Sequence, residues 1–336
     1  MEIFASNYLK GCVINVQLVL WIGIKQLIVK MDIKLEIRNN LFKQIERAKS
    51  NVIKLSLPHY LYQTTEQAKA YELATYGSKQ YHDSLDLPIL NLIEENINLL
   101  CDSLPQNIQF IDLGPGYPSK SFRILDELQF KGLNITYFPV DVSEFFLKRA
   151  TTAVTSRGIH CNQIHEKFEN LAEVLDRKLF RDDGARYIFL GLTFNNFQPE
   201  YISKILSGLV NKGDRCVICC QSPEGISEEK LTSPYKTQSV DDFCFYPLKL
   251  LGLTRNSFEF TVVFESDAVR VRYQAKQAVR VQDLVVDKGT IIETSASYRY
   301  SLPDVEKALA PYFQIEGVFR SKVENLALLQ LGCKEL

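Results

Sequence analysis

The sequence predicts an α/β protein built on a parallel sheet. Two features support this: strands that alternate with helices, and a glycine pair at the end of the first of these strands. Strands separated by helices pair in parallel, with both faces of the sheet covered. We expect strands at Ile108–Leu113, Ile135–Val140, Tyr187–Leu190 and Arg215–Cys220, and helices at Lys120–Leu128, Ser143–Thr152 and Pro199–Leu209.

The first expected strand ends in Phe110-Ile-Asp-Leu-Gly-Pro-Gly116, a segment typical of a nucleotide site. Gly114 and Gly116 let the backbone approach a ligand closely, and the next strand ends at Asp141, whose carboxylate can accept from two ribose hydroxyls. The glycine pair alone also fits an ordinary strand-to-helix turn. Because the third glycine of a pyrophosphate loop is missing, we expect a nucleoside such as S-adenosylmethionine (SAM) rather than NAD.

The rest of the chain predicts a second, α+β lobe. Its amino-terminal part is mostly helical in pattern and leads to a long amphipathic helix, whereas residues 258–299 favour strands. The expected elements are a helix at Leu85–Leu100 and strands at 258–264, 268–273, 278–281 and 290–293, followed by a helix at 303–310 and a strand at 326–331. We assign residues 31–84 and 225–296 to a substrate-binding lobe, and 85–224 and 297–336 to the SAM-binding domain.

Composition favours a small neutral or zwitterionic ligand. The 39 basic and 40 acidic residues nearly balance, so the overall charge does not direct the chain to nucleic acid or to an anionic membrane. The segment Cys216-Val-Ile-Cys219-Cys220 lies in an apolar run without a turn between the thiols. We therefore expect no metal site there, but reduced, buried cysteines in a cytoplasmic protein.

Residues 1–30 stand apart from this pattern. The apolar run Cys12–Val29 is interrupted by polar residues and a lysine, so a membrane span is not expected. Met31 opens an ordinary globular segment. We interpret residues 1–30 as an amino-terminal extension or an artefact of the chosen start site, and expect a chain that begins at Met31 to fold.

Four segments together resemble the histidine-specific SAM-dependent methyltransferase family, whose relatives methylate tryptophan-derived amines in ergot-type alkaloid pathways. The resemblance runs from about Leu57 to the carboxyl terminus, and the third segment is the most specific. The segments are Asp112–Gly116 with Lys120, Pro139–Ser143, Phe189–Pro199 and Ser297–Ser301. The resemblance implies a Rossmann-like SAM-dependent methyltransferase sheet.

The resemblance also implies roles for single residues. Asp112, Gly114, Gly116 and Lys120 fall on the cofactor loop, Asp141 on the ribose position, and Gly191 and Thr193 on the strand that borders the methyl donor. Asn196 matches an asparagine that holds the amino and carboxylate end of the substrate. Tyr235 and Tyr62 fall near tyrosines that assist it or line the pocket. As an alternative to binding the substrate, Asn195 or Asn196 could cap the following helix. The two tyrosines could instead be residues of the core.

Two departures from the family pattern concern the ligands. Where the family has an aspartate that contacts adenine, this chain has Lys167, with Glu166 and Gln163 nearby. Where histidine-binding members have a glutamate facing the imidazole, it has Ser295, two residues before the matching Ser297, and Arg299 replaces a lysine. Glu293 lies two residues before Ser295, on the same strand face if alternation holds. The distance between the two residues along the strand is about 6 to 7 Å.

These observations predict a SAM-dependent N-methyltransferase that acts on the amino group of an amino acid or related small amine, with histidine a poor substrate. Asn196, Tyr235 and Tyr62 are the expected catalytic residues, and Ser295, Ser297 and Glu293 the expected substrate pocket with Asn196. Two alternatives stay open: a degenerate member that binds a nucleoside or amino acid as a partner protein, and an enzyme that uses another nucleotide.

Overall fold

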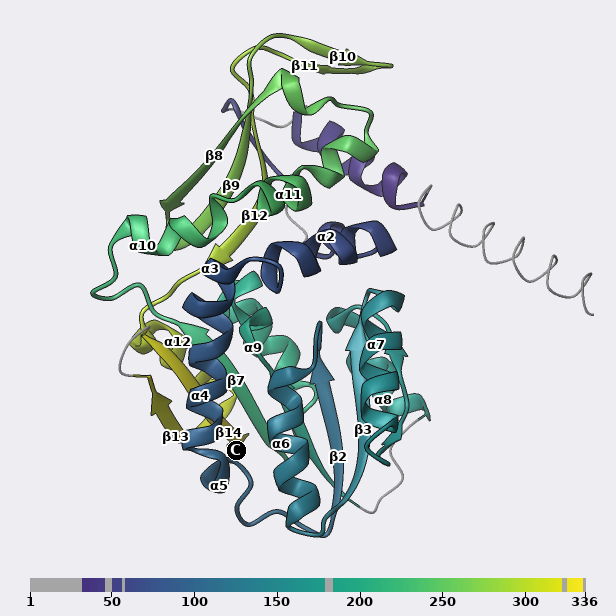
Figure 1. Cartoon of the computed structure of the whole chain (residues 1–336), viewed down its shortest axis with the longest axis vertical. Coiled ribbons are helices and arrows are strands. Elements are labelled where there is room, and N and C mark those ends of the chain that lie inside the picture. The colour runs from purple at the N-terminus through teal and green to yellow at the C-terminus, as the bar shows by residue number, and fades with distance from the viewer. Residues whose placement is uncertain (1–31, 46–49, 56–57, 179–183, 322–324, 335–336) are drawn as a thin grey trace, which may run out of the picture.

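The computed structural model describes residues 32–45, 50–55, 58–178, 184–321 and 325–334. The segment 1–30, interpreted above as an extension or a start-site artefact, lies outside the described residues. Figure 1 shows two sheets, a large one in the lower half of the view and a smaller one above it.

The large sheet has the Rossmann-like arrangement that the sequence predicts. Its strands follow the order β13-β14-β7-β6-β2-β3-β4, with β5 also paired to β3. Strands β7, β6, β2, β3, β4 and β5 pair in parallel. Strand β14 pairs antiparallel with β7, and β13 pairs antiparallel with β14. The strands are β2 (Asn107–Leu113), β3 (Asn134–Asp141), β4 (His160–Cys161), β5 (Ile164–His165), β6 (Ala185–Leu190), β7 (Arg215–Gln221), β13 (Phe313–Arg320) and β14 (Leu326–Cys333).

Helices cover both faces of this sheet, and each face has its own apolar core. One core joins the sheet to α4, α6 and α7, and the other to α8, α9 and α12. Cys216 and Cys220 lie in one core and Cys219 in the other, as strand alternation predicts. The helices are α4 (Leu87–Glu95), α5 (Ile97–Leu100), α6 (Ser119–Phe130), α7 (Glu144–Thr155), α8 (Leu171–Lys178), α9 (Pro199–Ser207) and α12 (Leu302–Leu309).

The strand order reverses at β2. From β2 the chain continues to β3 on one side, and later returns to β6 on the other side. A crevice forms at the carboxyl ends of strands where such a reversal occurs, and ligands of open α/β sheets bind there. The glycine loop after β2, Asp141 at the end of β3 and Gly191 after β6 all lie at this edge.

The small sheet has the order β1-β12-β9-β8 and carries the third core. That core also takes side chains from a helix at residues 32–45 and from α11. The elements are β1 (Val52–Lys54), η1 (Pro58–Leu61), α2 (Thr65–Thr75), α3 (Lys79–Tyr81), α10 (Glu228–Thr232), α11 (Gln238–Leu250), β8 (Phe258–Glu265), β9 (Ala268–Ala275) and β12 (Ile291–Tyr298), with β10 (Val279–Val281) and β11 (Leu284–Val286) as a separate hairpin.

Some local predictions were wrong. The single helix expected at Leu85–Leu100 is divided into a π-helix at His82–Asp86, α4 and α5, and it breaks at Asn96, whose side chain donates to the Leu92 carbonyl. A side-chain amide that competes for a helix carbonyl explains this break. Strands β1, β11 and β13 and helix α11 were not predicted.

We propose that the two sheets mark two lobes with the boundaries given above. The cores support this division, because the small-sheet core draws its buried residues from 33–74 and 231–292. The two cores of the large sheet draw theirs from 89–220 and 302–331. Strand β12 continues two residues beyond the boundary at residue 296.

The helix at 32–45 gives a direct test of the small-sheet core. Ile37 is fully buried there, whereas Leu35 on the same helix is 57% exposed. Ile37→Ala should lower the free energy of unfolding by about 2 to 5 kcal/mol, and the control Leu35→Ala should change it by less than about 0.5 kcal/mol. Equal effects in urea denaturation would show that this helix does not pack as described.

Candidate functional site

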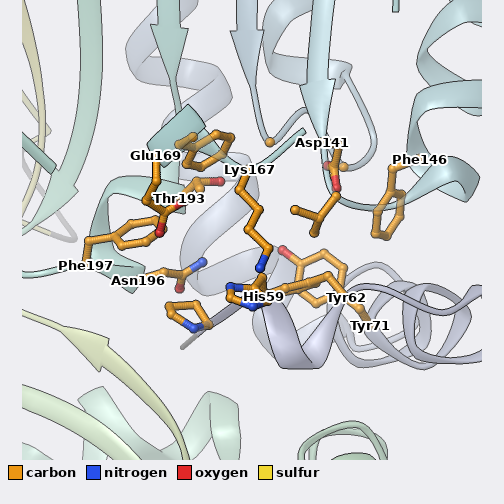
Figure 2. Close-up of a pocket in the computed structure, with 15 residues that line it drawn as sticks. His59, Tyr62, Tyr71, Asp141, Phe146, Lys167, Glu169, Thr193, Asn196 and Phe197 are labelled. Atoms are coloured by element: carbon orange, nitrogen blue, oxygen red, sulfur yellow. The ribbon is translucent and has the colours of Figure 1, made fainter. Parts of the chain in front are cut away.

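A cavity opens at the carboxyl edge of β2, β3 and β6, where the sequence predicts the ligand site. We call it the loop cavity. Figure 2 shows its walls: Asp141, Thr193 and Asn196 come from the large-sheet domain, and His59, Tyr62 and Tyr71 come from the region of η1 and α2. Gly114 and Gly116 also line it. Residues at the edge of the large sheet and residues packed against the small-sheet core therefore both line this cavity.

The loop after β2 requires glycine at both positions. Gly114 has φ +68° and Gly116 has φ +52°, in the left-handed region that side chains other than glycine rarely adopt. A Cβ on Gly114 would lie 2.9 Å from the Thr193 hydroxyl oxygen. The loop after β2 and the turn after β6 thus approach each other too closely for a side chain at position 114.

Asp141 is a buried carboxylate at the end of β3. It accepts a hydrogen bond from the Ser143 amide at 2.9 Å, and the Val142 and Gly116 amides also stabilise its charge. Burial is the larger effect and raises the pKa of Asp141 to about 7. Ser143 occupies the cap position of α7, but its hydroxyl makes no capping hydrogen bond. A ligand that donates to Asp141 would offset its lost hydration.

Asn196 ends the short 3-10 helix η4 (Leu192–Asn196) and points its amide into the cavity. The alternative of helix capping is wrong for both asparagines, because Gln198 holds the cap position of α9. The Asn196 side chain hydrogen-bonds the Tyr62 phenol. This hydrogen bond lowers the pKa of Tyr62, but burial is the largest effect and raises the pKa well above its usual value, so the phenol stays protonated at neutral pH.

A capping box fixes the turn that carries Tyr62. The Thr64 hydroxyl accepts from the Gln67 amide at 3.1 Å, and the Gln67 side chain accepts from the Thr64 amide at 3.0 Å. Gln67 also donates to the Tyr60 carbonyl. The Tyr62 ring packs edge-on against Tyr71, with centroids 5.2 Å apart. These buried contacts hold the phenol of Tyr62 against Asn196.

A second cavity, which we call the tyrosine cavity, also has Tyr62 and Asn196 in its wall. Its walls include Tyr235 and Ser297, as the sequence predicts, and also Ser295. Arg299 donates to the Tyr235 phenol at 2.8 Å and to the Ser297 hydroxyl at 2.8 Å. Tyr235 therefore packs against the small-sheet core, as the alternative expects, and its phenol is also held by a guanidinium.

Arg299 is only 2% exposed, and its guanidinium donates hydrogen bonds to neutral groups. Besides Tyr235 and Ser297 they are the Gln221 side chain at 2.7 Å and the Tyr298 carbonyl at 2.7 Å. No acidic side chain of the described chain lines the tyrosine cavity. A buried cation of this kind favours an anionic group in the ligand.

Glu293 faces a third cavity and not the tyrosine cavity. Its carboxylate accepts from Arg270 at 2.6 Å and from Arg272 at 3.1 Å. The expected alternation fails because a bulge shifts the register between Glu293 and Ser295. Glu293 is thus already paired, and it does not face the same cavity wall as Ser297.

Three residues that the family pattern places at the cofactor lie behind the cavity wall. Asp112 is buried and accepts from the Ser121 and Tyr137 hydroxyls, the latter at 2.6 Å, which ties β2 to α6 and β3. Burial raises the pKa of Asp112 to about 6. Lys120 forms an ion pair with Asp86 at 2.5 Å, and Gly191 immediately precedes η4 without lining the loop cavity.

Several residues of the loop cavity were missed or not assigned a role from the sequence. His59 and Glu169 line it, and Lys167 lies 3.7 Å from Glu36 of the helix at 32–45. Burial, and then the charge of Lys167, lower the pKa of His59. Glu166 instead accepts from the Lys167 amide, and neither Glu166 nor Gln163 lines the cavity.

The residues present fit a SAM molecule. The glycine loop leaves backbone exposed to the ligand, Asp141 can accept from ribose hydroxyls, and Phe168 and Phe197 offer apolar surface for a purine ring. In the described part of the chain, no helix is long and apolar enough to cross a membrane. The same residues contain no group of three or more potential metal ligands.

The ionisation of Asp141 gives a prediction for SAM affinity. Its raised pKa means that below about pH 7 the free protein must lose a proton before the carboxylate can accept from ribose. SAM affinity should therefore fall as pH decreases from 8 to 6, by up to about tenfold per unit.

Asp141→Asn should weaken SAM binding by about 1.5 to 3 kcal/mol, or roughly 10- to 100-fold, and should remove this pH dependence. The control Asp126→Asn changes an exposed aspartate on α6 and should alter neither. Isothermal calorimetry at several pH values measures both effects. A pH dependence that persists in Asp141→Asn would assign it to another group.

Comparison with known proteins finds SAM-dependent methyltransferases, in agreement with a site that fits SAM. The family model described as histidine-specific methyltransferase, SAM-dependent, matches residues 43–331. A 4-dimethylallyltryptophan N-methyltransferase from Epichloe festucae var. lolii is 24% identical over 177 residues, which span 48% of this chain and 49% of the relative. An enzyme of the same description from Arthroderma benhamiae is 24% identical over 299 residues, which span 79% and 86%.

Solved structures are less similar. A SAM-dependent methyltransferase from Clostridium acetobutylicum covers 80% of this chain and 98% of its own, with 16% identity and a TM-score of 0.45. The structure of OxaC covers 90% of this chain and 63% of its own, with 13% identity and a TM-score of 0.48. The assignment rests on the family model. Because that model spans most of the sequence, this protein belongs to the histidine-specific SAM-dependent methyltransferase family.

Proposed function

We propose that this enzyme transfers a methyl group from SAM to the amino nitrogen of an amino acid or a related small amine. The observation that carries the proposal is that Tyr62 and Asn196 line both the loop cavity and the tyrosine cavity. A group held by these two side chains lies at the boundary between the two spaces. Two molecules, one in each cavity, would meet there.

Asn196 suits the head group of an amino acid. Its amide has two donors and one acceptor with two lone pairs, and it binds a zwitterion without adding charge to the site. The Arg299, Tyr235 and Ser297 group offers donors to a carboxylate in the tyrosine cavity. An amine near Tyr62 and a carboxylate near Tyr235 would fix the orientation of the substrate.

SAM supplies a methyl group on a sulfonium that is already activated for transfer. The protein therefore has to position the amine and keep it unprotonated, and no side chain needs to act as a covalent nucleophile. The tyrosine cavity favours the neutral amine, because its aromatic walls and the charge of Arg299 are not offset by a carboxylate among its described lining residues. Asn196 then directs the nitrogen lone pair toward the loop cavity.

The side-chain specificity follows from Ser295 and Glu293. A neutral hydroxyl at Ser295 lacks the charged hydrogen bond that an imidazole nitrogen would receive from a carboxylate. Glu293 cannot substitute because two arginines already pair with it. We propose that aromatic amino acids are better substrates than histidine. The two relatives named as methyltransferases of a tryptophan derivative support this class.

A competition assay read by mass spectrometry tests the substrate class. With SAM and equal concentrations of tryptophan, tyrosine, histidine and tryptamine, the aromatic amino acids should be methylated at least about tenfold faster than histidine. Tryptamine should also be poor because it lacks the carboxylate expected at Arg299. Efficient methylation of histidine would refute the argument from Ser295. Efficient methylation of tryptamine would refute the role of Arg299.

Asn196→Ala tests the head-group site. The loss of a hydrogen bond to the neutral amine should weaken binding of every amino acid alike, by about 0.5 to 1.5 kcal/mol, while SAM affinity stays close to that of the wild type. The control is Asn211→Ala, which changes an exposed asparagine after α9. If Asn196→Ala weakens only one substrate, Asn196 contacts a side chain and not the shared head group.

A further inference from the structure

A third cavity adjoins the same two residues on the side of the small sheet. We call it the bulge cavity. Like the other two cavities it is lined by Tyr62 and Asn196, and it shares Ser295 with the tyrosine cavity. It encloses about 230 Å³, whereas the tyrosine cavity encloses about 60 Å³. The three cavities thus have Tyr62 and Asn196 as common wall residues.

The bulge in β12 shapes this cavity. Residues 293–296 all line it, although a regular strand would turn only alternate residues to one side. Ala296, with its small side chain, leaves room at the wall. Leu55, Leu61 and Tyr298 supply apolar surface from three different segments. The cavity can therefore enclose the apolar body of a large group.

The charges of the bulge cavity are almost neutralised within the protein. Glu293 pairs with Arg270 and Arg272, and Arg270 also donates to the Glu265 carbonyl at 2.9 Å. Lys54 lies at the exposed rim. A cationic group would meet Lys54 and Arg270 without an unpaired carboxylate among the described lining residues. The cavity therefore disfavours a cationic group, and its apolar walls favour an uncharged one.

We propose that the bulge cavity binds the side chain of the amino acid substrate and selects a bulky, uncharged ring. The α-carbon of an amino acid bears three groups, which match the three cavities: the amine faces the loop cavity, the carboxylate faces Arg299 in the tyrosine cavity, and the side chain enters the bulge cavity. This inference rests on the proposed function. It adds the site and the class of the side chain.

Two matched variants test the inference. Ala296→Trp fills the bulge cavity, and Ala74→Leu narrows the tyrosine cavity, which Ala74 lines from α2. Ala296→Trp should raise the KM for tryptophan at least about tenfold and leave the KM for alanine within about twofold, because alanine has no ring to place there. Ala74→Leu should raise the KM for both substrates. Melting temperature and the Kd for SAM report whether each variant is folded.

The opposite pattern overturns the inference. If Ala74→Leu selectively impairs tryptophan while Ala296→Trp does not, the side chain occupies the tyrosine cavity. If Ala296→Trp does not bind SAM, Ala296→Leu allows the same comparison with a smaller group. An unchanged KM for tryptophan in Ala296→Trp would refute only the inference about the bulge cavity. Failure of the wild type to methylate any amine would instead refute the proposed function itself.

Discussion

The contact between Tyr62 and Asn196 is the constraint on which the site depends. Asn196 lies after β6 of the large sheet, whereas Tyr62 follows η1, next to the small-sheet core. All three cavities are bounded by this pair. Because each side chain comes from a different proposed lobe, the way the two lobes pack determines whether a methyl donor and an amine can meet.

Two buried charged groups on either side of this contact give the site its polarity. Asp141 has a raised pKa because burial outweighs the amides that point to it. Arg299 is held by neutral partners. Burial deprives both side chains of hydration. A ligand that donates to Asp141 or accepts from Arg299 therefore offsets a desolvation cost. The protein is in this sense prepared for a nucleoside on one side and a carboxylate on the other.

The sequence was sufficient for the Rossmann-like sheet, because the period of its strands and helices and the glycine loop are local signals. It was insufficient for β13 and for the break at Asn96, which depend on strand pairing and on one side-chain hydrogen bond. Asn196 and Asp141 were found through motifs. The pairing of Glu293 with two arginines was not, since it requires a bulge and a neighbouring strand that no motif records.

A crystal structure with S-adenosylhomocysteine and tryptophan bound together would test the central claim most directly. We expect the amino nitrogen of tryptophan to lie within about 3.5 Å of the Asn196 side chain and to face the sulfur across the boundary marked by Tyr62, with the indole ring in the bulge cavity. An amine bound away from both Tyr62 and Asn196, with its nitrogen out of reach of the sulfur, would contradict it.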